Sequence, residues 1–220
     1  MSPARPRGED VTTFDTEAAR RFYDRMGRHH DRMERFEGRA KAAAVAALDL
    51  APGLRVLDVG AGPGTTHGLL ARAVEPSGWA VALDISPVML RLVRDRTASD
   101  VCQGDVLNLP LAKASFDRVF CSYLLDLLPS AVLPNALVEL RRVLSPGGRI
   151  AIVGMTDGTT PTSRIVVGAW RALYRRSPQS CGGCRPIVIE PLLRRGGFRG
   201  LHRRVVVERG LPSEILTANR

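Results

Sequence analysis

Residues 55–66 read Arg55-Val56-Leu57-Asp58-Val59-Gly60-Ala61-Gly62-Pro63-Gly64-Thr65-Thr66, and this stretch decides the fold. Its apolar start predicts a parallel β-strand that is covered on both faces. The glycines that follow predict a tight turn, because a residue without a Cβ lets the chain turn sharply and lets a ligand approach the backbone. A helix is expected from Leu69 to Val74. Strand, glycine loop and helix together form the first half of a nucleotide-binding βαβ unit.

The spacing of the glycines and the acid before them indicate which ligand the loop binds. A pyrophosphate cofactor favours Gly-x-Gly-x-x-Gly, with its phosphates at the helix N-terminus. Here the third glycine comes one residue early, at Gly64, and Thr65 follows it. Asp58 repels a pyrophosphate but attracts a ligand that carries an ammonium and a sulfonium, such as S-adenosylmethionine (SAM). These features disfavour an NAD-dependent oxidoreductase.

The same segment resembles motif I of the class I SAM-dependent methyltransferases, (Asp/Glu)-x-Gly-x-Gly-x-Gly. The resemblance implies that this loop binds the cofactor. The residues it assigns are Asp58, Gly60, Ala61, Gly62 and Gly64.

The next predicted strand, Trp79–Asp84, also ends in an acid. Asp84 lies roughly 25 residues past the first glycine, near the spacing at which a carboxylate binds a ribose diol in such folds. We expect Asp84 to accept hydrogen bonds from both ribose hydroxyls. The alternative is an acid that stabilises the start of the next helix, which Ser86-Pro87 signals. By the resemblance, Ile85 and Met89 flank the adenine.

A third predicted strand, Asp100–Gln103, runs into Gly104-Asp105-Val106. The Asp105 carboxylate can accept from the adenine amino group, while the next backbone N–H donates to the ring. This element resembles the Gly-Asp-(Val/Ala) element of the same methyltransferases, and it assigns Gly104, Asp105 and Val106 to the cofactor.

The loop after the fourth strand, Phe116–Cys121, lies where α/β folds place their ligands. In related methyltransferases its backbone carbonyls hold the methionine ammonium, and its side chains face the methyl acceptor. We therefore expect Ser122 at the cofactor, and Tyr123 and Asp126 as catalytic candidates. Core packing is an equal alternative for Tyr123.

Two aromatic–acid pairs precede motif I, Tyr23-Asp24 and His30-Asp31. They resemble the paired Tyr-Asp elements of the ubiquinone/menaquinone biosynthesis methyltransferases, the type 11 group. In that group the N-terminal helices cap the cofactor, and the aromatic hydroxyls reach the cofactor or substrate. The resemblance assigns Tyr23 to the cofactor. His30 replaces the second tyrosine and is a catalytic candidate, with an exposed helix position as the alternative.

The whole chain is predicted to be a Rossmann-like, doubly wound α/β domain with a seven-stranded, mostly parallel sheet. We expect disorder over residues 1–12 and a single domain over 13–220, with a helical cap at 13–50 and a lid insertion at 156–184, after strand five. Leu140–Ile150 resembles the family element that precedes strand five. The further expected helices are Ala42–Leu50, Ala136–Leu144, Arg164–Arg176 and Ile187–Arg195, with strands at Arg149–Val153, Phe198–Val207 and Ser213–Ala218.

The composition bears on whether the protein is expected to bind nucleic acid or a membrane surface. The net charge is +10, but lysine occurs only at Lys41 and Lys113, so the charge comes almost wholly from arginine. Such scattered arginine specifies no nucleic-acid face, and the Asn/Asp-Pro-Pro-Tyr and Pro-Cys motifs of base methylation are absent. Arginine-rich amphipathic helices would also suit an anionic membrane surface, although a solvated helix face is the simpler interpretation.

The cysteines and the N-terminal residues indicate whether a metal site is expected and in which cellular compartment the protein is expected to act. Cys181-Gly-Gly-Cys184 has metal-like spacing but lacks the second pair that a structural zinc site needs, so no metal is predicted. No apolar run reaches the roughly 20 residues of a membrane span, and Met1–Asp10 lacks a signal-peptide core. Ordinary thiols in a reducing, cytoplasmic location are expected.

The sequence therefore predicts a SAM-dependent methyltransferase that acts on a small, lipophilic or aromatic acceptor such as a quinone, a natural product or a phospholipid head group. S-adenosylhomocysteine (SAH) would be the product. An RNA methyltransferase and a non-catalytic SAM-binding regulator remain alternatives. The acceptor atom, the use of a general base and the oligomeric state are left open.

Overall fold

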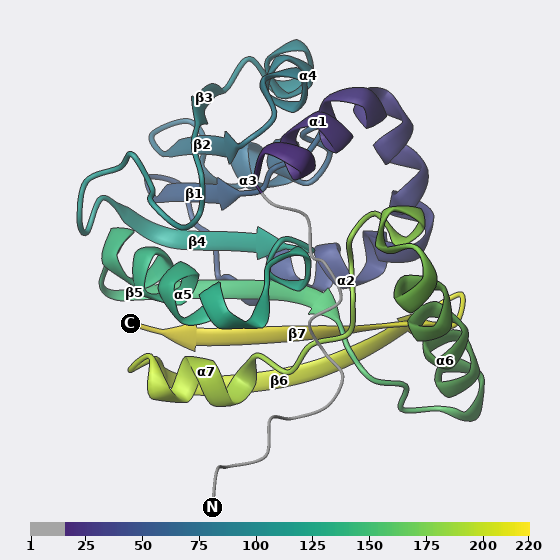
Figure 1. Ribbon diagram of the computed structural model, residues 1–220. Coiled ribbons are helices and arrows are strands. Elements are labelled where there is room, and N and C mark those ends of the chain that lie inside the picture. The colour runs from purple at the N-terminus through teal and green to yellow at the C-terminus, as the bar shows by residue number, and fades with distance from the viewer. Residues whose placement is uncertain (1–15) are drawn as a thin grey trace, which may run out of the picture.

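The computed structural model describes residues 16–220, which are built around a seven-stranded sheet (Figure 1). The strand order is β3-β2-β1-β4-β5-β7-β6. Strands β1 to β5 run parallel, and β7 is antiparallel to both of its neighbours. The strands are β1 Arg55–Val59, β2 Trp79–Asp84, β3 Asp100–Gln103, β4 Phe116–Ser122, β5 Leu144–Met155, β6 Arg199–Glu208 and β7 Leu211–Asn219. The predicted fold class is confirmed. The predicted disordered segment 1–12 lies outside the described residues.

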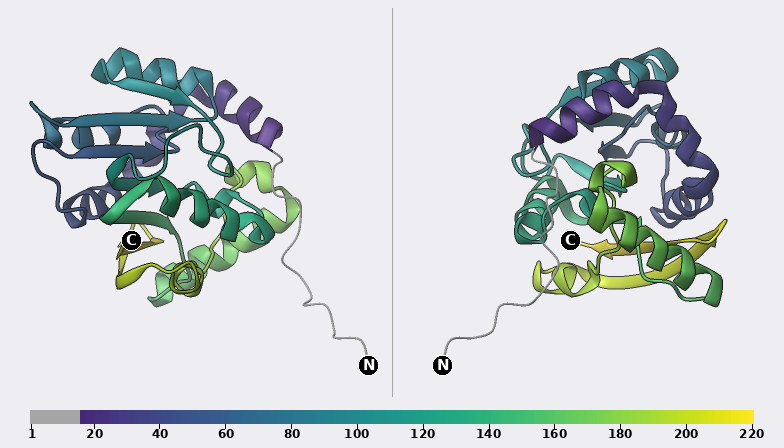
Figure 2. Two further views of the ribbon diagram at one scale, coloured as in Figure 1. Left: turned by 90° about the vertical axis from the view of Figure 1, so that its left-hand side faces the viewer. Right: turned by 45° about the vertical axis from the view of Figure 1, so that its right-hand side comes forward.

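Helices cover both faces of the sheet, as the turned views show (Figure 2). The α-helices are α1 Thr16–Met26, α2 Glu34–Ala47, α3 His67–Val74, α4 Pro87–Thr97, α5 Leu133–Val143, α6 Pro161–Arg176 and α7 Glu190–Arg195, and the 3₁₀ helices are η1 Gly27–Met33, η2 Leu125–Leu127, η3 Ser130–Val132 and η4 Pro178–Cys181.

The apolar run of β1 fills two cores. Val56 packs in the cluster that α2 and α3 form on one face, and Leu57 packs in the cluster that α5 and α7 form on the other. Both side chains are completely buried. Because successive strand side chains point to opposite faces, a central parallel strand must be apolar on both. This is why the stretch from Arg55 onwards predicts the strand so clearly.

The start of α4 follows its sequence signals. Ser86 is the N-cap, and its Oγ accepts a hydrogen bond from the Met89 backbone N–H at 3.1 Å. Pro87 occupies the first turn, where its missing N–H costs nothing. The helix ends at Thr97, and its C-cap, Ala98, adopts a left-handed conformation. The predicted bounds of β2 and β3 are also confirmed.

Two local predictions are wrong. A separate helix over Ala42–Leu50 does not exist, because α2 runs continuously from Glu34 to Ala47. The predicted start of the fifth strand at Arg149 is too late, because β5 begins at Leu144, where it pairs with β4, and it pairs with β4 again at Arg149. The intervening residues form a bulge, and a bulge absorbs extra residues without ending the strand.

The carboxyl ends of the central strands lie beneath a cap. In Figure 1 the arrowheads of β1, β2, β4 and β5 point towards the side where α1 and α6 lie. The cap is made of α1, η1 and the first part of α2, with α6 and η4 beside it. None of the helices that the structure describes is both long enough and apolar enough to cross a membrane.

Candidate functional site

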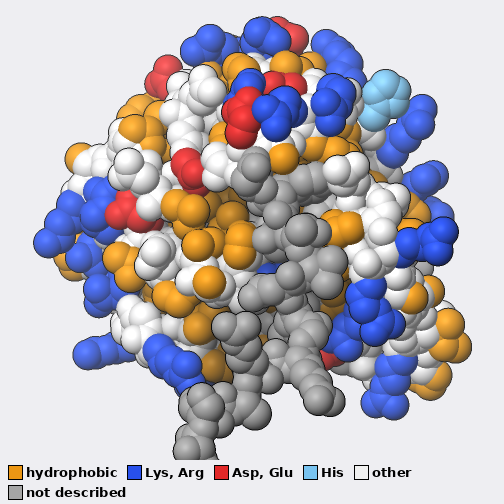
Figure 3. Space-filling view, viewed as in Figure 1, with side chains coloured by type: hydrophobic (Ala, Val, Ile, Leu, Met, Phe, Trp, Pro, Cys, Tyr) orange, Lys and Arg blue, Asp and Glu red, His pale blue; other side chains and the backbone are white. Residues whose placement is uncertain are grey.

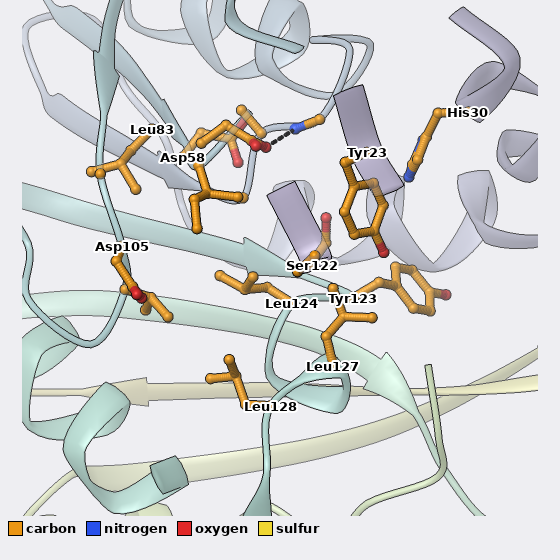
Figure 4. A pocket seen from close by; sticks show the side chains of 18 of the residues that line it. Tyr23, His30, Asp58, Leu83, Asp105, Ser122, Tyr123, Leu124, Leu127 and Leu128 are labelled. Atoms are coloured by element: carbon orange, nitrogen blue, oxygen red, sulfur yellow. Dashed lines mark hydrogen bonds between the residues drawn. The ribbon is translucent and has the colours of Figure 1, made fainter. Parts of the chain in front are cut away.

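A cavity of about 310 Å³ lies at the carboxyl ends of β1, β2 and β4. In Figure 4, Leu83 and Asp105 lie on one side of it, and Tyr23, His30 and Tyr123 lie on the other. Predicted site residues that line it are Tyr23, His30, Asp58, Gly60, Ala61, Gly62, Asp84, Ile85, Gly104, Asp105, Val106, Ser122 and Tyr123. The structure thus brings together segments that are far apart in the chain.

The glycine loop is tied to the neighbouring strand. The backbone N–H groups of Gly60 and Ala61 both donate to the Leu83 carbonyl, at 2.8 and 3.1 Å. Gly60 has a φ of +73°, and a Cβ there would lie 3.1 Å from a methyl carbon of Leu124. Both facts require glycine at this position. The loop therefore keeps its backbone at the cavity wall.

Gly64 has a different role from the one that the motif suggests. It does not line the cavity. A Cβ on Gly64 would lie 3.0 Å from the Cα of Val93, so this glycine lets the loop pack directly on α4. The motif here combines glycines for the cavity wall with one for packing.

Asp84 ends β2 and is held by the backbone on both sides. Its Oδ2 accepts from the Gly62 N–H at 2.9 Å, and its Oδ1 accepts from the Ser86 N–H at 2.9 Å. Burial raises the pKa of this carboxyl to about 6. The two backbone N–H groups that donate to it act in the opposite direction and lower its pKa, but burial has the larger effect. Each oxygen keeps a lone pair, so the carboxylate can still accept from a ligand in the cavity.

Asp58, at the end of β1, lies in the cavity wall beside a histidine. Only 1% of Asp58 is exposed, and its Oδ2 lies 3.3 Å from Nδ1 of the completely buried His67. His67 could not be found from the sequence, because nothing in its spacing from Asp58 signals that the first residue of α3 turns back towards β1.

The loop after β3 forms the opposite end of the cavity. Asp105 accepts from the Leu107 N–H at 2.9 Å through Oδ1 and from the Thr16 hydroxyl of α1 at 3.2 Å through Oδ2. Val106 and Ile85 add apolar surface near it. Met89, in the first turn of α4, is fully buried and does not line the cavity, so the structure does not place it beside a ligand there.

Tyr123 forms the wall after β4 and has a φ of +50°, a left-handed conformation that is strained for a tyrosine. Its hydroxyl is 2.6 Å from the Ser213 hydroxyl of β7. Burial raises the pKa of Tyr123 well above its usual value. The ring faces the cavity while the hydroxyl is tied to β7.

Asp126, a predicted catalytic residue, lies behind the cavity rather than in its wall. It is completely buried, and its Oδ2 accepts from the Met155 N–H at 3.1 Å. Its backbone carbonyl accepts from the Arg185 N–H at 3.2 Å. Burial raises the pKa of this carboxyl to about 7. The aspartate fastens the loop after β4 to β5 and to the segment that precedes α7.

The cap is joined to the cavity wall by polar contacts. The Tyr23 hydroxyl donates to the Gly182 carbonyl at 3.1 Å. The Ser86 hydroxyl donates to Asp24 at 2.6 Å, and Arg96 binds both oxygens of Asp31 at 3.0 and 2.6 Å. The rings of Tyr23 and His30 lie 6.1 Å apart, centroid to centroid.

Sequence analysis also missed a buried ion pair on α2. Lys41 Nζ lies 2.8 Å from Glu37 Oε2, and each side chain is only 7% exposed. Lys41 Nζ is 5.5 Å from the centre of the Tyr123 ring. Both residues line the cavity. The available signal was an acid and a base four residues apart on one helix, which is usually a solvated pair.

The four cysteines are free thiols, and burial raises the pKa of both Cys181 and Cys184. Over residues 16–220, no three His, Cys, Asp or Glu side chains gather as a metal site would require.

Comparisons with known proteins agree with this geometry. Residues 56–148 match a family model described as a methyltransferase domain. A malonyl-[acyl-carrier protein] O-methyltransferase of Erwinia pyrifoliae is 36% identical over 137 residues, which cover 61% of this chain and 49% of that protein. A demethylmenaquinone methyltransferase of Corynebacterium urealyticum is 41% identical over 114 residues, which cover 52% and 47%. The chain thus spans about half the length of these curated relatives.

A solved structure shares the fold. It is a SAM-dependent methyltransferase from Aquifex aeolicus with a TM-score of 0.62 and 20% identity, and the match covers 94% of this chain and 98% of that one. The cofactor predicted from the glycine loop fits the residues present, with acids at the ends of β1 and β2 and an apolar wall between them. The predicted resemblance is confirmed: residues 56–148 belong to the methyltransferase domain family, and the chain has the fold of a SAM-dependent methyltransferase.

Proposed function

We propose that the protein transfers a methyl group from SAM to a small, lipophilic or aromatic acceptor. One observation carries this proposal. A second cavity of about 360 Å³ lies beside the first, and Tyr23, His30, Glu37 and Tyr123 line both. A cofactor in the first cavity and an acceptor in the second would meet at these four residues.

In this proposal the first cavity holds the cofactor. Asp84 accepts from the ribose hydroxyls with the lone pairs that the backbone leaves unused. Asp105 and Val106 bind the adenine amino group and ring, with Ile85 against its face. Asp58 and Ser122 lie towards the methionine end, where a carboxylate balances a cationic group. Gly64 lets the loop pack closely on α4, and Met89 of α4 is buried behind the cavity wall.

The second cavity takes the acceptor, and the region 156–184 forms its lid. Trp170 of α6 and the Cys181-Gly-Gly-Cys184 segment line it, and the Tyr23 hydroxyl joins the cap to the lid at Gly182. Most of its lining is apolar, aromatic or sulfur-bearing, which suits a lipophilic guest. A relative named for demethylmenaquinone is consistent with such an acceptor.

When bound, SAM supplies an electrophilic methyl group on a sulfonium. The chain's own contribution is to hold the acceptor in line with that group and to exclude water, and positioning of this kind can supply about 7–11 kcal/mol of the barrier. The cap and lid close the site from two sides. His30 lies at the junction, where it can orient the acceptor or accept a proton.

The test is methyl transfer with tritiated SAM into an extract of the cells that make the protein. Label in the organic phase, absent with an Asp84→Ala variant, supports a small lipophilic acceptor. Label in acid-precipitable RNA would establish the nucleic-acid alternative instead. Binding of SAM without any transfer would favour a regulatory role.

A further inference from the structure

The second cavity is lined by few charged side chains. The chain has 32 lysines and arginines, yet none lines this cavity within the part of the chain that the structure describes. In Figure 3 the Lys and Arg side chains lie mostly around the outline of the visible face, and hydrophobic side chains lie nearer its middle. Among residues 16–220, Glu37 is the only acidic residue that lines the second cavity, and His30 is the only other titratable group there besides tyrosines and cysteines.

A negatively charged acceptor would be poorly bound in such a cavity. A carboxylate or phosphate would lose its hydration, would find no guanidinium or ammonium in the wall and would lie near Glu37. A positively charged acceptor gains little either, because Lys41 Nζ already lies 2.8 Å from Glu37 and 5.5 Å from the centre of the Tyr123 ring. The cavity therefore favours an uncharged guest.

The lining also favours a flat guest. Aromatic rings come from three elements and the loop after β4, and five sulfur-bearing side chains line the cavity with them. Both kinds of side chain pack well on ring faces. The aromatic residues are Phe22, Tyr23, Phe36, Tyr123 and Trp170, and the sulfur-bearing ones are Met26, Met33, Met155, Cys181 and Cys184.

Among the four residues at the junction, the two tyrosines are poor proton acceptors. The Tyr23 hydroxyl donates to Gly182, and the Tyr123 hydroxyl is paired with Ser213. Burial raises the pKa of both phenols well above the usual value, so both stay protonated. Glu37 remains, with the Lys41 ammonium 2.8 Å from one of its carboxyl oxygens. His30 is the competing group.

We propose that the second cavity takes an uncharged aromatic hydroxyl compound and that Glu37 accepts its hydroxyl proton during methyl transfer. The acceptor oxygen forms a bond to the methyl carbon as the carbon–sulfur bond breaks, and that bond's electron pair stays on sulfur. The hydroxyl proton passes to the Glu37 carboxylate. The products are a neutral aryl methyl ether and neutral SAH. This inference rests on the proposed function and names its acceptor class.

The binding test compares two probes with the same ring system, 2-naphthol and 2-naphthoate, by calorimetric titration into the full-length protein saturated with SAH. We expect 2-naphthol to bind at least about tenfold more tightly than the anion, since burying an unpaired charge costs well over 1.4 kcal/mol. Met33→Arg adds a guanidinium to the wall and is expected to improve naphthoate binding by about tenfold. Equal or tighter binding of naphthoate by the unmodified protein would overturn the proposal.

The catalytic test measures formation of 2-methoxynaphthalene from 2-naphthol and SAM. Glu37→Gln keeps the shape and the contact to Lys41 but cannot accept the proton, so the turnover rate is expected to fall on the order of 100-fold. Binding of SAH and 2-naphthol should stay within about threefold, and Glu37→Asp should recover part of the rate. An unchanged rate in Glu37→Gln, or a comparable loss found only in His30→Gln, contradicts the role of Glu37.

The binding results distinguish a failure of the proposed function from a failure of the proposed acceptor class. If SAH does not bind, the proposed function itself fails. If SAH binds and 2-naphthol does not, the cofactor site stands and only the acceptor class named here is wrong.

Discussion

Asp84 shows how one side chain serves both the fold and the proposed chemistry. Its two oxygens accept from the N–H groups of Gly62 and Ser86, so the carboxylate joins the glycine loop to the start of α4. The same carboxylate lies in the cavity wall. The backbone contacts fix the position of the carboxylate before a ligand binds. Less conformational entropy is therefore lost on binding.

Replacing Asp84 with alanine is expected to weaken SAH binding by about 100-fold or more. Two hydrogen bonds to a charged group are lost, each worth roughly 1.5–3 kcal/mol. Isothermal titration of SAH measures the change. Asp95→Asn, an exposed acid on α4, is the matched control and should bind as the unmodified protein does. Affinity within about twofold of normal in Asp84→Ala would refute the ribose assignment.

The sequence predicts residues of this site unevenly. Asp84 and Asp105 could be found because Asp84 ends β2 and Asp105 follows the end of β3, at the carboxyl edge of the sheet, where such folds bind ligands. Gly64, Met89 and Asp126 were assigned from the motif or from loop position, and the structure places all three behind the cavity. Whether a residue lines the cavity or lies behind it depends on packing between segments that are far apart in the chain. The local spacing of residues in the sequence does not show this.

At the scale of elements, the cap is positioned by a few polar links rather than by a large apolar interface. No residue of α1 or η1 is fully buried. Arg96 of α4 connects η1 to the glycine loop through Asp31 and through the Thr65 hydroxyl at 2.9 Å. Elements with few buried contacts open at low free-energy cost.

Arg96→Met is therefore expected to loosen the cap and to weaken SAH binding by about 3- to 10-fold, corresponding to the roughly 1 kcal/mol of a partly exposed, bidentate ion pair. Hydrogen exchange over α1 and η1 should accelerate, while exchange in β1 and β4 stays unchanged. Arg94→Met, on the same helix, is the control. If exchange and affinity are the same in both variants, the link to Asp31 does not position the cap.

Some boundaries of the helices and strands could also be predicted from local sequence signals, and others could not. The strands β2 and β3 and the start of α4 were predictable because apolar runs, an N-cap serine and a proline mark them locally. The continuous α2 and the bulged start of β5 were not. In β5 the Pro-Gly-Gly sequence has the composition of a turn, but pairing of Leu144 and Arg149 with β4 holds it in the sheet.

At the scale of the whole molecule, two buried acids make stability depend on pH. Burial raises the pKa of Asp84 to about 6 and that of Asp126 to about 7, whereas in the unfolded chain both titrate near their usual value of about 4. Between these values the folded protein binds more protons than the unfolded chain. The free energy of unfolding therefore falls as the pH rises from about 4 to 7.

Asp126→Asn should remove much of this dependence, because the amide stays neutral and its oxygen can still accept from the Met155 N–H. At pH 8 we expect the variant to exceed the unmodified protein in unfolding free energy by on the order of 1–3 kcal/mol, with little difference near pH 4. Urea unfolding across pH 4–8 measures this, with the exposed Asp157→Asn as control. Parallel pH profiles for Asp126→Asn and the unmodified protein would show that the carboxyl ionises normally when folded.

The central claim is that the cavity at the carboxyl edge of the sheet binds an adenosyl sulfonium and not a dinucleotide. Isothermal titration of the purified protein with SAM, SAH and NADH, side by side, tests it most directly. The account predicts micromolar binding of both adenosyl compounds and no measurable heat from NADH, because the acid before the glycine loop repels a pyrophosphate. Binding of NADH without either adenosyl compound would contradict it.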